Sequence, residues 1–119
     1  LVTLAGGTRD QAIAAASMVF QSMLDLICDP IANRVEAPCL GKNVMAASHA
    51  LSCANMALAG FDPLIPLDEV IDAAKAVSER MPREHRCTSL GGLAITPTSL
   101  EIERKLASLK GKGCGSCHC

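Results

Sequence analysis

The sequence contains no tryptophan or tyrosine, and only two phenylalanines among its 119 residues. A hydrophobic core must therefore be built from alanine, leucine, isoleucine, valine and methionine, and small side chains of this kind let helices approach one another closely. Half of the chain is apolar, which is enough for the core of one helical domain of this length.

Excess charge of either sign is also missing. The formal net charge is -1, which gives no electrostatic argument for binding nucleic acid or an anionic membrane surface. The apolar run over residues 11–27 raises the question of a membrane span, but Arg9, Asp10, Gln21 and Asp25 interrupt or flank it. Alanine dominates the run, so we expect a buried helix and no membrane partner.

The chain opens with Leu1 rather than methionine, in a stretch typical of the middle of a helix. We expect it to be a fragment of a longer protein or a processed product, and no signal peptide can be judged from it. Seven cysteines would predict disulfides in a secreted protein of this size, whereas in a reducing cytoplasm they favour metal or cluster ligation. With no sign of export, we expect a cytoplasmic protein.

Hydrophobic periodicity predicts an all-α fragment with four helices. Thr8 and Gln11 form a capping box ahead of the first, Gly60 stops the second, and Pro82 ends the third. An irregular, cysteine-bearing loop separates the first two. The expected helices span residues 9–27, 42–58, 67–80 and 98–110.

The loop over residues 28–39 is bounded by Cys28 and Cys39 and stiffened by Pro30 and Pro38. Proline lacks an amide donor and restricts the residue before it, so we expect rigid non-helical backbone, with Cys28 at the end of the first helix. Thiolates are the usual ligands of iron–sulfur clusters and zinc. Two buried free cysteines that pack as small hydrophobic side chains are the alternative.

Two features of the second expected helix have both a structural and a functional interpretation. His49 and Cys53 lie four residues apart and share a helix face, which suits a metal, although a packed pair is the default without a third ligand. Asn43 and Ser48 are polar candidates for facing an anion at the helix N-terminus. A capping asparagine and a tolerated helix serine explain these two residues equally well.

Short motifs stand out along most of the chain. Around the loop they are Cys28-Asp29-Pro30 and residues 35–39, followed by Asn43. Further motifs lie at residues 5–8, 56–60, 65–66, 68–73, 81–82, 91–94 and 96–98. So many motifs in this order resemble the C-terminal part of the alpha subunit, or alpha domain, of iron–sulfur-dependent L-serine dehydratase.

This resemblance implies a 4Fe–4S cluster held by three cysteines, of which Cys28 and Cys39 supply two and the third lies upstream of this sequence. An open iron would bind L-serine through its hydroxyl and carboxylate oxygens and act as a Lewis acid. A general base would remove the α-proton, water would leave, and the aminoacrylate would hydrolyse to pyruvate and ammonia. The base is unknown, since His49 and His85 are unsupported.

The resemblance further implies a beta subunit or beta domain as partner, an oligomeric and oxygen-sensitive enzyme, and a role in amino-acid catabolism and gluconeogenesis. Two positions depart from the family pattern. Cys87 stands where the family usually has Glu between Arg86 and Thr88, and it is a candidate additional ligand. Lys42, expected near the substrate with Asn43, replaces a favoured Arg and lacks the planar fork for a carboxylate.

We expect residues 111–119 to form a flexible cysteine-rich tail after a domain that spans residues 1–110. The helix before the tail is expected to start at a capping box of Thr98 and Glu101. Cys114, Cys117 and His118 match the haem-attachment pattern, but the tail has no room for a haem pocket, so a metal-binding or redox tail is the better interpretation. Cys119 is a candidate removable fourth ligand of the cluster.

Two alternatives to the serine lyase stay open. One is a non-catalytic module in which Cys28, Cys39 and the tail thiols bind zinc or a cluster. The other is a lyase for another β-substituted amino acid, for which Lys42 and Cys87 leave room. Colour separates the first alternative from the enzyme, because zinc is colourless and a 4Fe–4S centre absorbs visible light.

Overall fold

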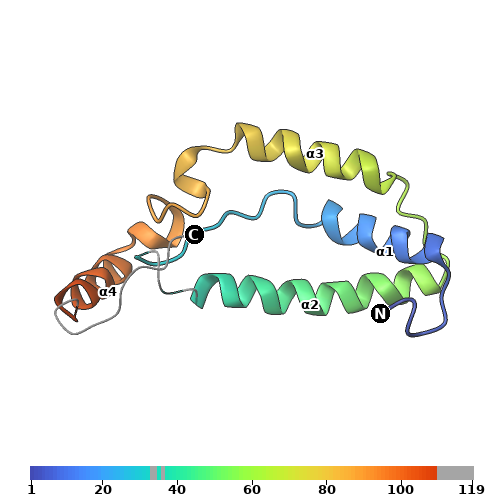
Figure 1. Ribbon diagram of the computed structural model, residues 1–119, viewed down its shortest axis with the longest axis horizontal. Helices are drawn as coiled ribbons and strands as arrows, with labels where there is room; N and C mark the ends of the chain where they lie inside the picture. Colours follow the sequence, from blue (N-terminus) through green and yellow to red (C-terminus); the bar gives the residue numbers. More distant parts are fainter. Residues whose placement is uncertain (33–34, 36, 110–119) are drawn as a thin grey trace. The chain divides into compact units, whose positions relative to one another are not determined.

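Four α-helices form the described part of the chain, which is residues 1–32, 35 and 37–109 of a computed structural model (Figure 1). No β-strand occurs in these residues, so the all-α prediction is confirmed. Two short 3-10 turns lie between the last two helices. The elements are α1 (Arg9–Gln21), α2 (Ala37–Leu58), α3 (Leu67–Arg80), η1 (Arg83–His85), η2 (Gly92–Ile95) and α4 (Pro97–Ser108).

The chain folds into two compact units that each combine distant parts of the sequence. The first unit contains Leu1–Leu26 and Leu40–Met81, and therefore α1, α3 and nearly all of α2. The second contains Ile27–Cys39 together with the described residues from Pro82 to Leu109, which include η1, η2 and α4. The loop between the two predicted ligand cysteines thus belongs to the second unit.

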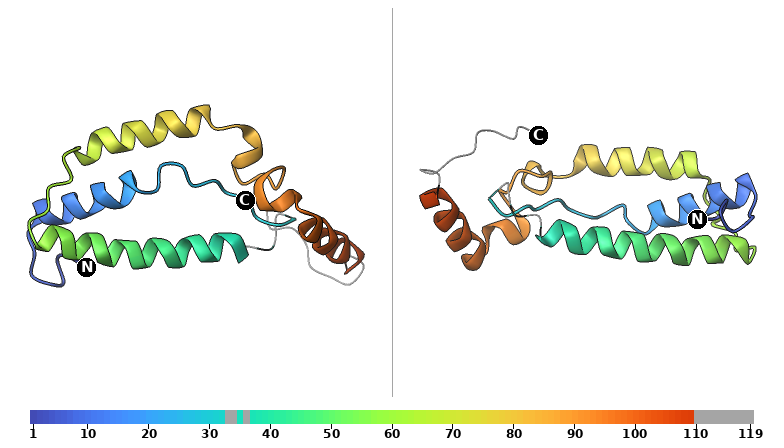
Figure 2. Two further views of the ribbon diagram at one scale, coloured as in Figure 1. Left: turned by 180° about the vertical axis from the view of Figure 1, so that it is seen from behind. Right: turned by 60° about the horizontal axis from the view of Figure 1, so that its bottom comes forward.

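In the first unit, α1 lies between α2 and α3 (Figures 1 and 2). Small residues fill the interface, as expected for a chain with so few aromatic side chains. Alanine lets the helix backbones approach closely because it has no side chain beyond Cβ. The buried members of this core are Val2, Ala15, Met18, Cys53, Ala54 and Ala57.

Helix α1 begins as predicted but ends earlier. The Gln11 amide donates to the Thr8 hydroxyl, and the Thr8 amide donates to Gln11 Oε1 at 2.9 Å, which is the predicted capping box. The helix ends at Gln21 rather than at residue 27, and that boundary was wrong. The segment around Cys28 lies outside the helix because its backbone pairs with residues 85–87 instead.

Helix α2 begins earlier than predicted, at Ala37 rather than at residue 42. Pro38 falls within its first turn, where a missing amide removes no helical hydrogen bond. The expectation that Pro38 keeps its segment out of helix was therefore wrong. Gly60, at φ +84°, follows the end of α2 as predicted, and α3 ends at Arg80 ahead of Pro82.

Helix α4 begins with a different cap from the one predicted. Thr96 accepts a hydrogen bond from the Ser99 amide, and Pro97 occupies the first helical position. The predicted capping box of Thr98 and Glu101 is wrong, because Thr98 already lies inside the helix. Proline suits the first position since its fixed φ is already helical.

None of the helices in the described residues combines the length and the apolar character needed to cross a bilayer. The apolar run over residues 11–27 instead contributes Ala15 and Met18 to the core of the first unit.

Candidate functional site

Cys28 lies in extended backbone that pairs with residues 85–87 of the second unit. Its amide donates a hydrogen bond to the His85 carbonyl at 3.0 Å, and its carbonyl accepts one from the Cys87 amide at 2.9 Å. These bonds form a parallel bridge between Cys28 and Arg86. The prediction that Cys28 ends a helix is therefore wrong, and sheet-like pairing holds this cysteine instead.

The same pairing brings Cys87 next to Cys28. The two residues form a disulfide with Cα atoms 4.6 Å apart, although 59 positions separate them in the sequence. Cys87 has a left-handed backbone, with φ at 60°. The candidate additional thiol is thus beside one of the two predicted ligands, and no spacing pattern in the sequence identifies that contact.

Asp29 is a buried polar residue that sequence patterns did not mark as part of a site. It is 1% exposed, and its Oδ2 accepts a hydrogen bond from the Leu93 amide at 2.8 Å. Gly92 leaves the room for this contact, since a Cβ there would lie 2.8 Å from the same oxygen. The bond ties the Cys28 segment to η2, and its one advance signal was the Cys28-Asp29-Pro30 motif.

A second contact braces the same segment. The Ser89 hydroxyl donates a hydrogen bond to the Pro30 carbonyl, and Pro30 is itself buried. Residues 28–30 are therefore held along their length by three stretches of the later chain, at residues 85–87, 89 and 93. The position of the Cys28 thiol is set by these long-range contacts.

Cys39, the other predicted ligand, lies in the first turn of α2 with a free and half-buried thiol. Amides without helical partners lie in such a turn, and they favour an anion such as a thiolate. Lys42 and Asn43 follow three and four positions later, so they share a face of α2 with Cys39. Asn43 is exposed inside the helix and is not its cap.

The donor set of the second unit suits a soft metal. Cys28, Cys39 and Cys87 all belong to this unit, and sulfur is the preferred donor for iron–sulfur clusters and a common one for zinc. Within residues 1–32, 35 and 37–109, no three or more His, Cys, Asp or Glu side chains already surround one point. Cys39 has a free thiol, whereas Cys28 and Cys87 are joined in the disulfide, so the sulfurs of this unit fit such a group only when that bond is reduced. The tail cysteines, Cys119 among them, lie outside the described residues.

Neither of the two histidines of the described range has a contact that marks it as a general base. His49 Nε2 lies 3.4 Å from Cys53 Sγ within α2. Cys53 is 1% exposed, and burial raises the pKa of its thiol, so the packed pair is the better interpretation. His85 has a buried Nδ1 with no hydrogen-bond partner in the described part of the chain, held against the backbone near Gly91.

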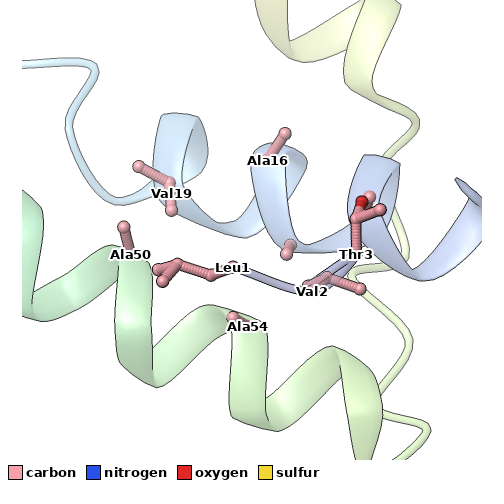
Figure 3. Close-up of a pocket in the computed structure, with 9 residues that line it drawn as sticks. Leu1, Val2, Thr3, Ala16, Val19, Ala50 and Ala54 are labelled. Atoms are coloured by element: carbon pink, nitrogen blue, oxygen red, sulfur yellow. The ribbon is translucent and has the colours of Figure 1, made fainter. Parts of the chain in front are cut away.

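A hollow of about 220 Å³ lies in the first unit between α1, α2 and residues 1–3 (Figure 3). Leu1 lies in it between Val19 of α1 and Ala50 of α2. The lining side chains are aliphatic except for Thr3, and none of them ionises. Their chemistry supports neither proton transfer nor metal binding, so the hollow is a gap in helix packing.

Comparison with known proteins gives one consistent result. The family model described as "Serine dehydratase alpha chain" matches residues 1–94. The "Probable L-serine dehydratase, alpha chain" of Bacillus subtilis (strain 168) is 48% identical over 106 residues, which cover 89% of this chain and 35% of that protein. The protein of the same name from Latilactobacillus sakei is 46% identical over 105 residues, 88% of this chain and 50% of that protein.

A third relative has a name that does not mention an alpha chain. "L-serine dehydratase 1" of Escherichia coli (strain K12) is 38% identical over 96 residues, which cover 80% of this chain and 21% of that protein. The chain thus spans at most about half the length of these relatives. No solved structure matches the chain.

Proposed function

Because the chain belongs to the serine dehydratase alpha-chain family, we propose that it is part of an L-serine dehydratase, a lyase that converts L-serine to pyruvate and ammonia. The family match over residues 1–94 carries this proposal. The chain covers 35% of the Bacillus subtilis relative and 50% of the Latilactobacillus sakei relative. The activity is therefore proposed for the complete protein that contains this sequence.

We propose that Cys28 and Cys39 bind a 4Fe–4S cluster as two of its thiolate ligands. When bound, the cluster would supply a Lewis-acidic iron that makes the substrate hydroxyl a better leaving group. The fixed backbone of Cys28 and the free thiol of Cys39 in the first turn of α2 support these two roles. The family resemblance assigns a ligand role to Cys28 and Cys39 and none to Cys87, so Cys87 is left out of the proposed ligand set. In the disulfide neither Cys28 nor Cys87 has a thiolate, so Cys28 can bind iron only when that bond is reduced.

We propose that Lys42 and Asn43 lie near the substrate. The ammonium group of Lys42 would attract the carboxylate of L-serine as a point charge, without the bidentate geometry of arginine. Asn43 offers both a donor and an acceptor from an exposed position on α2. We propose that the general base comes from the rest of the complete protein, since no contact of His49 or His85 supports that role.

Exposed apolar side chains on α2 support a further polypeptide partner. Leu40, Val44 and Leu51 are 64%, 61% and 53% exposed, and their spacing places them on one face of the helix. An apolar face of this kind marks an interaction surface more often than a free one. We propose that the beta subunit or beta domain covers it, in an oligomer that works in the reducing cytoplasm.

The proposal is tested on the complete reading frame that contains this sequence, co-expressed with its beta partner and purified without oxygen. We expect pyruvate to form from L-serine, and we expect Cys28→Ser and Cys39→Ser to lose both iron and activity. Cys53→Ala is the matched control, because Cys53 is a buried core cysteine of α2. It should keep its iron and its activity.

Other outcomes distinguish the alternatives. A protein that binds a cluster but does not turn over L-serine would support another β-substituted amino acid as substrate. A colourless protein that contains zinc would contradict the cluster and support a structural metal module. Deleting residues 111–119 tests Cys119 as a removable fourth ligand: the visible spectrum of the resting cluster should change, and an unchanged spectrum would contradict that role.

A further inference from the structure

The disulfide between Cys28 and Cys87 joins a proposed metal ligand to a residue that is not one. Their Cα atoms are 4.6 Å apart, within the range of about 4.4–6.8 Å that a disulfide requires. The reciprocal backbone contacts, from the Cys28 amide to His85 and from the Cys87 amide to Cys28, hold the two residues side by side.

We propose that Cys28 and Cys87 form a reversible disulfide that withdraws Cys28 from metal binding under oxidising conditions and returns it on reduction. The reason is that a sulfur bonded to another sulfur has no thiolate with which to bind iron. Cys28 can therefore serve the cluster or the disulfide, but not both. This inference rests on the proposed function, since the withdrawn ligand is one of the proposed cluster cysteines.

Contacts other than the S–S bond keep the two thiols within reach after reduction. Asp29 Oδ2 accepts from the Leu93 amide at 2.8 Å, and the Ser89 hydroxyl donates to the Pro30 carbonyl. Each contact joins a residue just C-terminal to Cys28 with a residue shortly C-terminal to Cys87. Reduction should therefore leave the pair poised to close again.

Exposure determines which thiol reacts first. Cys87 lies at the surface and Cys28 is half-buried, so we expect the Cys87 thiolate to attack a small-molecule disulfide such as oxidised glutathione. One glutathione thiolate leaves, and a mixed disulfide forms on Cys87. The Cys28 thiolate then attacks the Cys87 sulfur and releases the second glutathione. In total, two electrons and two protons pass from the two protein thiols to one oxidised glutathione, which becomes two molecules of reduced glutathione.

The pairing can be measured without any metal. The complete protein is freed of iron with a chelator, equilibrated without oxygen in mixtures of reduced and oxidised glutathione, alkylated, and digested with trypsin. Cys28 and Cys87 then lie on the separate peptides 10–34 and 87–104, and the other cysteines of this sequence lie on peptides that begin at residues 35, 43 and 113. We expect the two peptides to be linked in the oxidising mixtures and unlinked in the reducing ones.

Iron uptake tests the consequence of the pairing. Oxidised and reduced protein are incubated without added thiol with equal amounts of ferrous and ferric iron and with sulfide, and bound iron is measured. The peptide map is repeated on the oxidised sample, because sulfide can itself open a disulfide and the comparison requires the Cys28–Cys87 bond to be closed. The oxidised wild type should take up less than about a tenth of the iron of the reduced protein, because its Cys28 offers no thiolate. Cys87→Ser should take up iron equally well after both treatments, and the Cys53→Ala control should behave like the wild type.

Three results would overturn the inference. If peptides 10–34 and 87–104 are linked in none of the mixtures, the proposed disulfide is contradicted. The proposed function still stands in that case, provided that the reduced protein binds iron. Loss of iron from reduced Cys87→Ser and Cys87→Ala would make Cys87 a ligand instead. If neither the reduced wild type nor reduced Cys87→Ser takes up iron, the result contradicts the proposed cluster. It then also contradicts the proposal that the disulfide controls iron binding.

Discussion

Replacing Gly92 with alanine should destabilise the second unit by more than the free-energy cost of a left-handed backbone at a non-glycine residue. Gly92 has a φ of +61°, and an added Cβ would lie 2.8 Å from Asp29 Oδ2 and 3.0 Å from Ile27 Cδ1. A left-handed backbone costs a non-glycine residue about 1–2 kcal/mol. Displacing Asp29 also breaks its bond to the Leu93 amide, and a hydrogen bond to a charged group is worth about 1.5–3 kcal/mol.

The expected loss for Gly92→Ala is therefore about 2.5–5 kcal/mol in the free energy of unfolding. Urea unfolding measures this loss, and amide hydrogen exchange at Leu93 reports the broken bond directly. Gly60→Ala is a matched control, because Gly60 has φ +84° and open space where the Cβ would be. It should cost only the backbone share, about 1–2 kcal/mol.

A double-mutant cycle checks the physical cause. In an Asp29→Ala background the contact with the carboxylate and the bond to Leu93 are already gone, so Gly92→Ala should cost less than in the wild type. It should still cost more than the backbone share of about 1–2 kcal/mol, because the Cβ of position 29 and Ile27 Cδ1 stay 3.0 Å from the added Cβ. The explanation is refuted if Gly92→Ala costs no more than Gly60→Ala, or if its cost is the same with and without the Asp29 carboxylate.

Further predictions concern the packing and the thiols. Ser17→Ala should lower the free energy of unfolding by about 1–3 kcal/mol, because it removes the donor that binds the Ile65 carbonyl at 2.7 Å; urea unfolding will show this, and no change would contradict it. The apoprotein should be about 4 kcal/mol more stable oxidised than reduced, because the Cys28–Cys87 disulfide closes a loop of 59 positions; Cys87→Ser should remove the difference. Burial raises the pKa of Cys53 above its usual 9.0, so stability from the neutral thiol is complete below the usual pKa and falls as pH rises through the raised value. Urea unfolding of the wild type at several pH values should show this decrease in the free energy of unfolding, and Cys53→Ala should not show it.

Much of the fold follows from local patterns. The capping box of Thr8 and Gln11, the stop at Gly60 and the end of α3 ahead of Pro82 each depend on residues within about one helical turn of the boundary. The all-α class and the alanine-rich core follow from periodicity and from the lack of aromatic residues in the same way. A linear sequence contains all the information that such local features need.

The helix boundaries that were predicted wrongly have two kinds of cause. One is pairing with a remote segment of the chain, and the other is the exact position that a residue takes in the first turn of a helix. Apolar spacing extends the first helix to residue 27, but α1 ends at Gln21 and Cys28 pairs with residues 85–87. Pro38 was predicted to exclude helix, yet it occupies a position in the first turn of α2 where its missing donor costs nothing. In α4, Thr96 with Pro97 takes the role predicted for Thr98.

The sequence by itself determined the family resemblance, the helical class and the cysteines proposed as ligands, because each of these depends on residue identities in order. Only the tertiary structure brought Cys87 to Cys28 and buried Asp29 against the amide of Leu93. Those contacts join residues 59 and 64 positions apart. Such contacts form when extended backbone finds hydrogen-bond partners on a remote segment, and no spacing within either segment specifies which partner it will be.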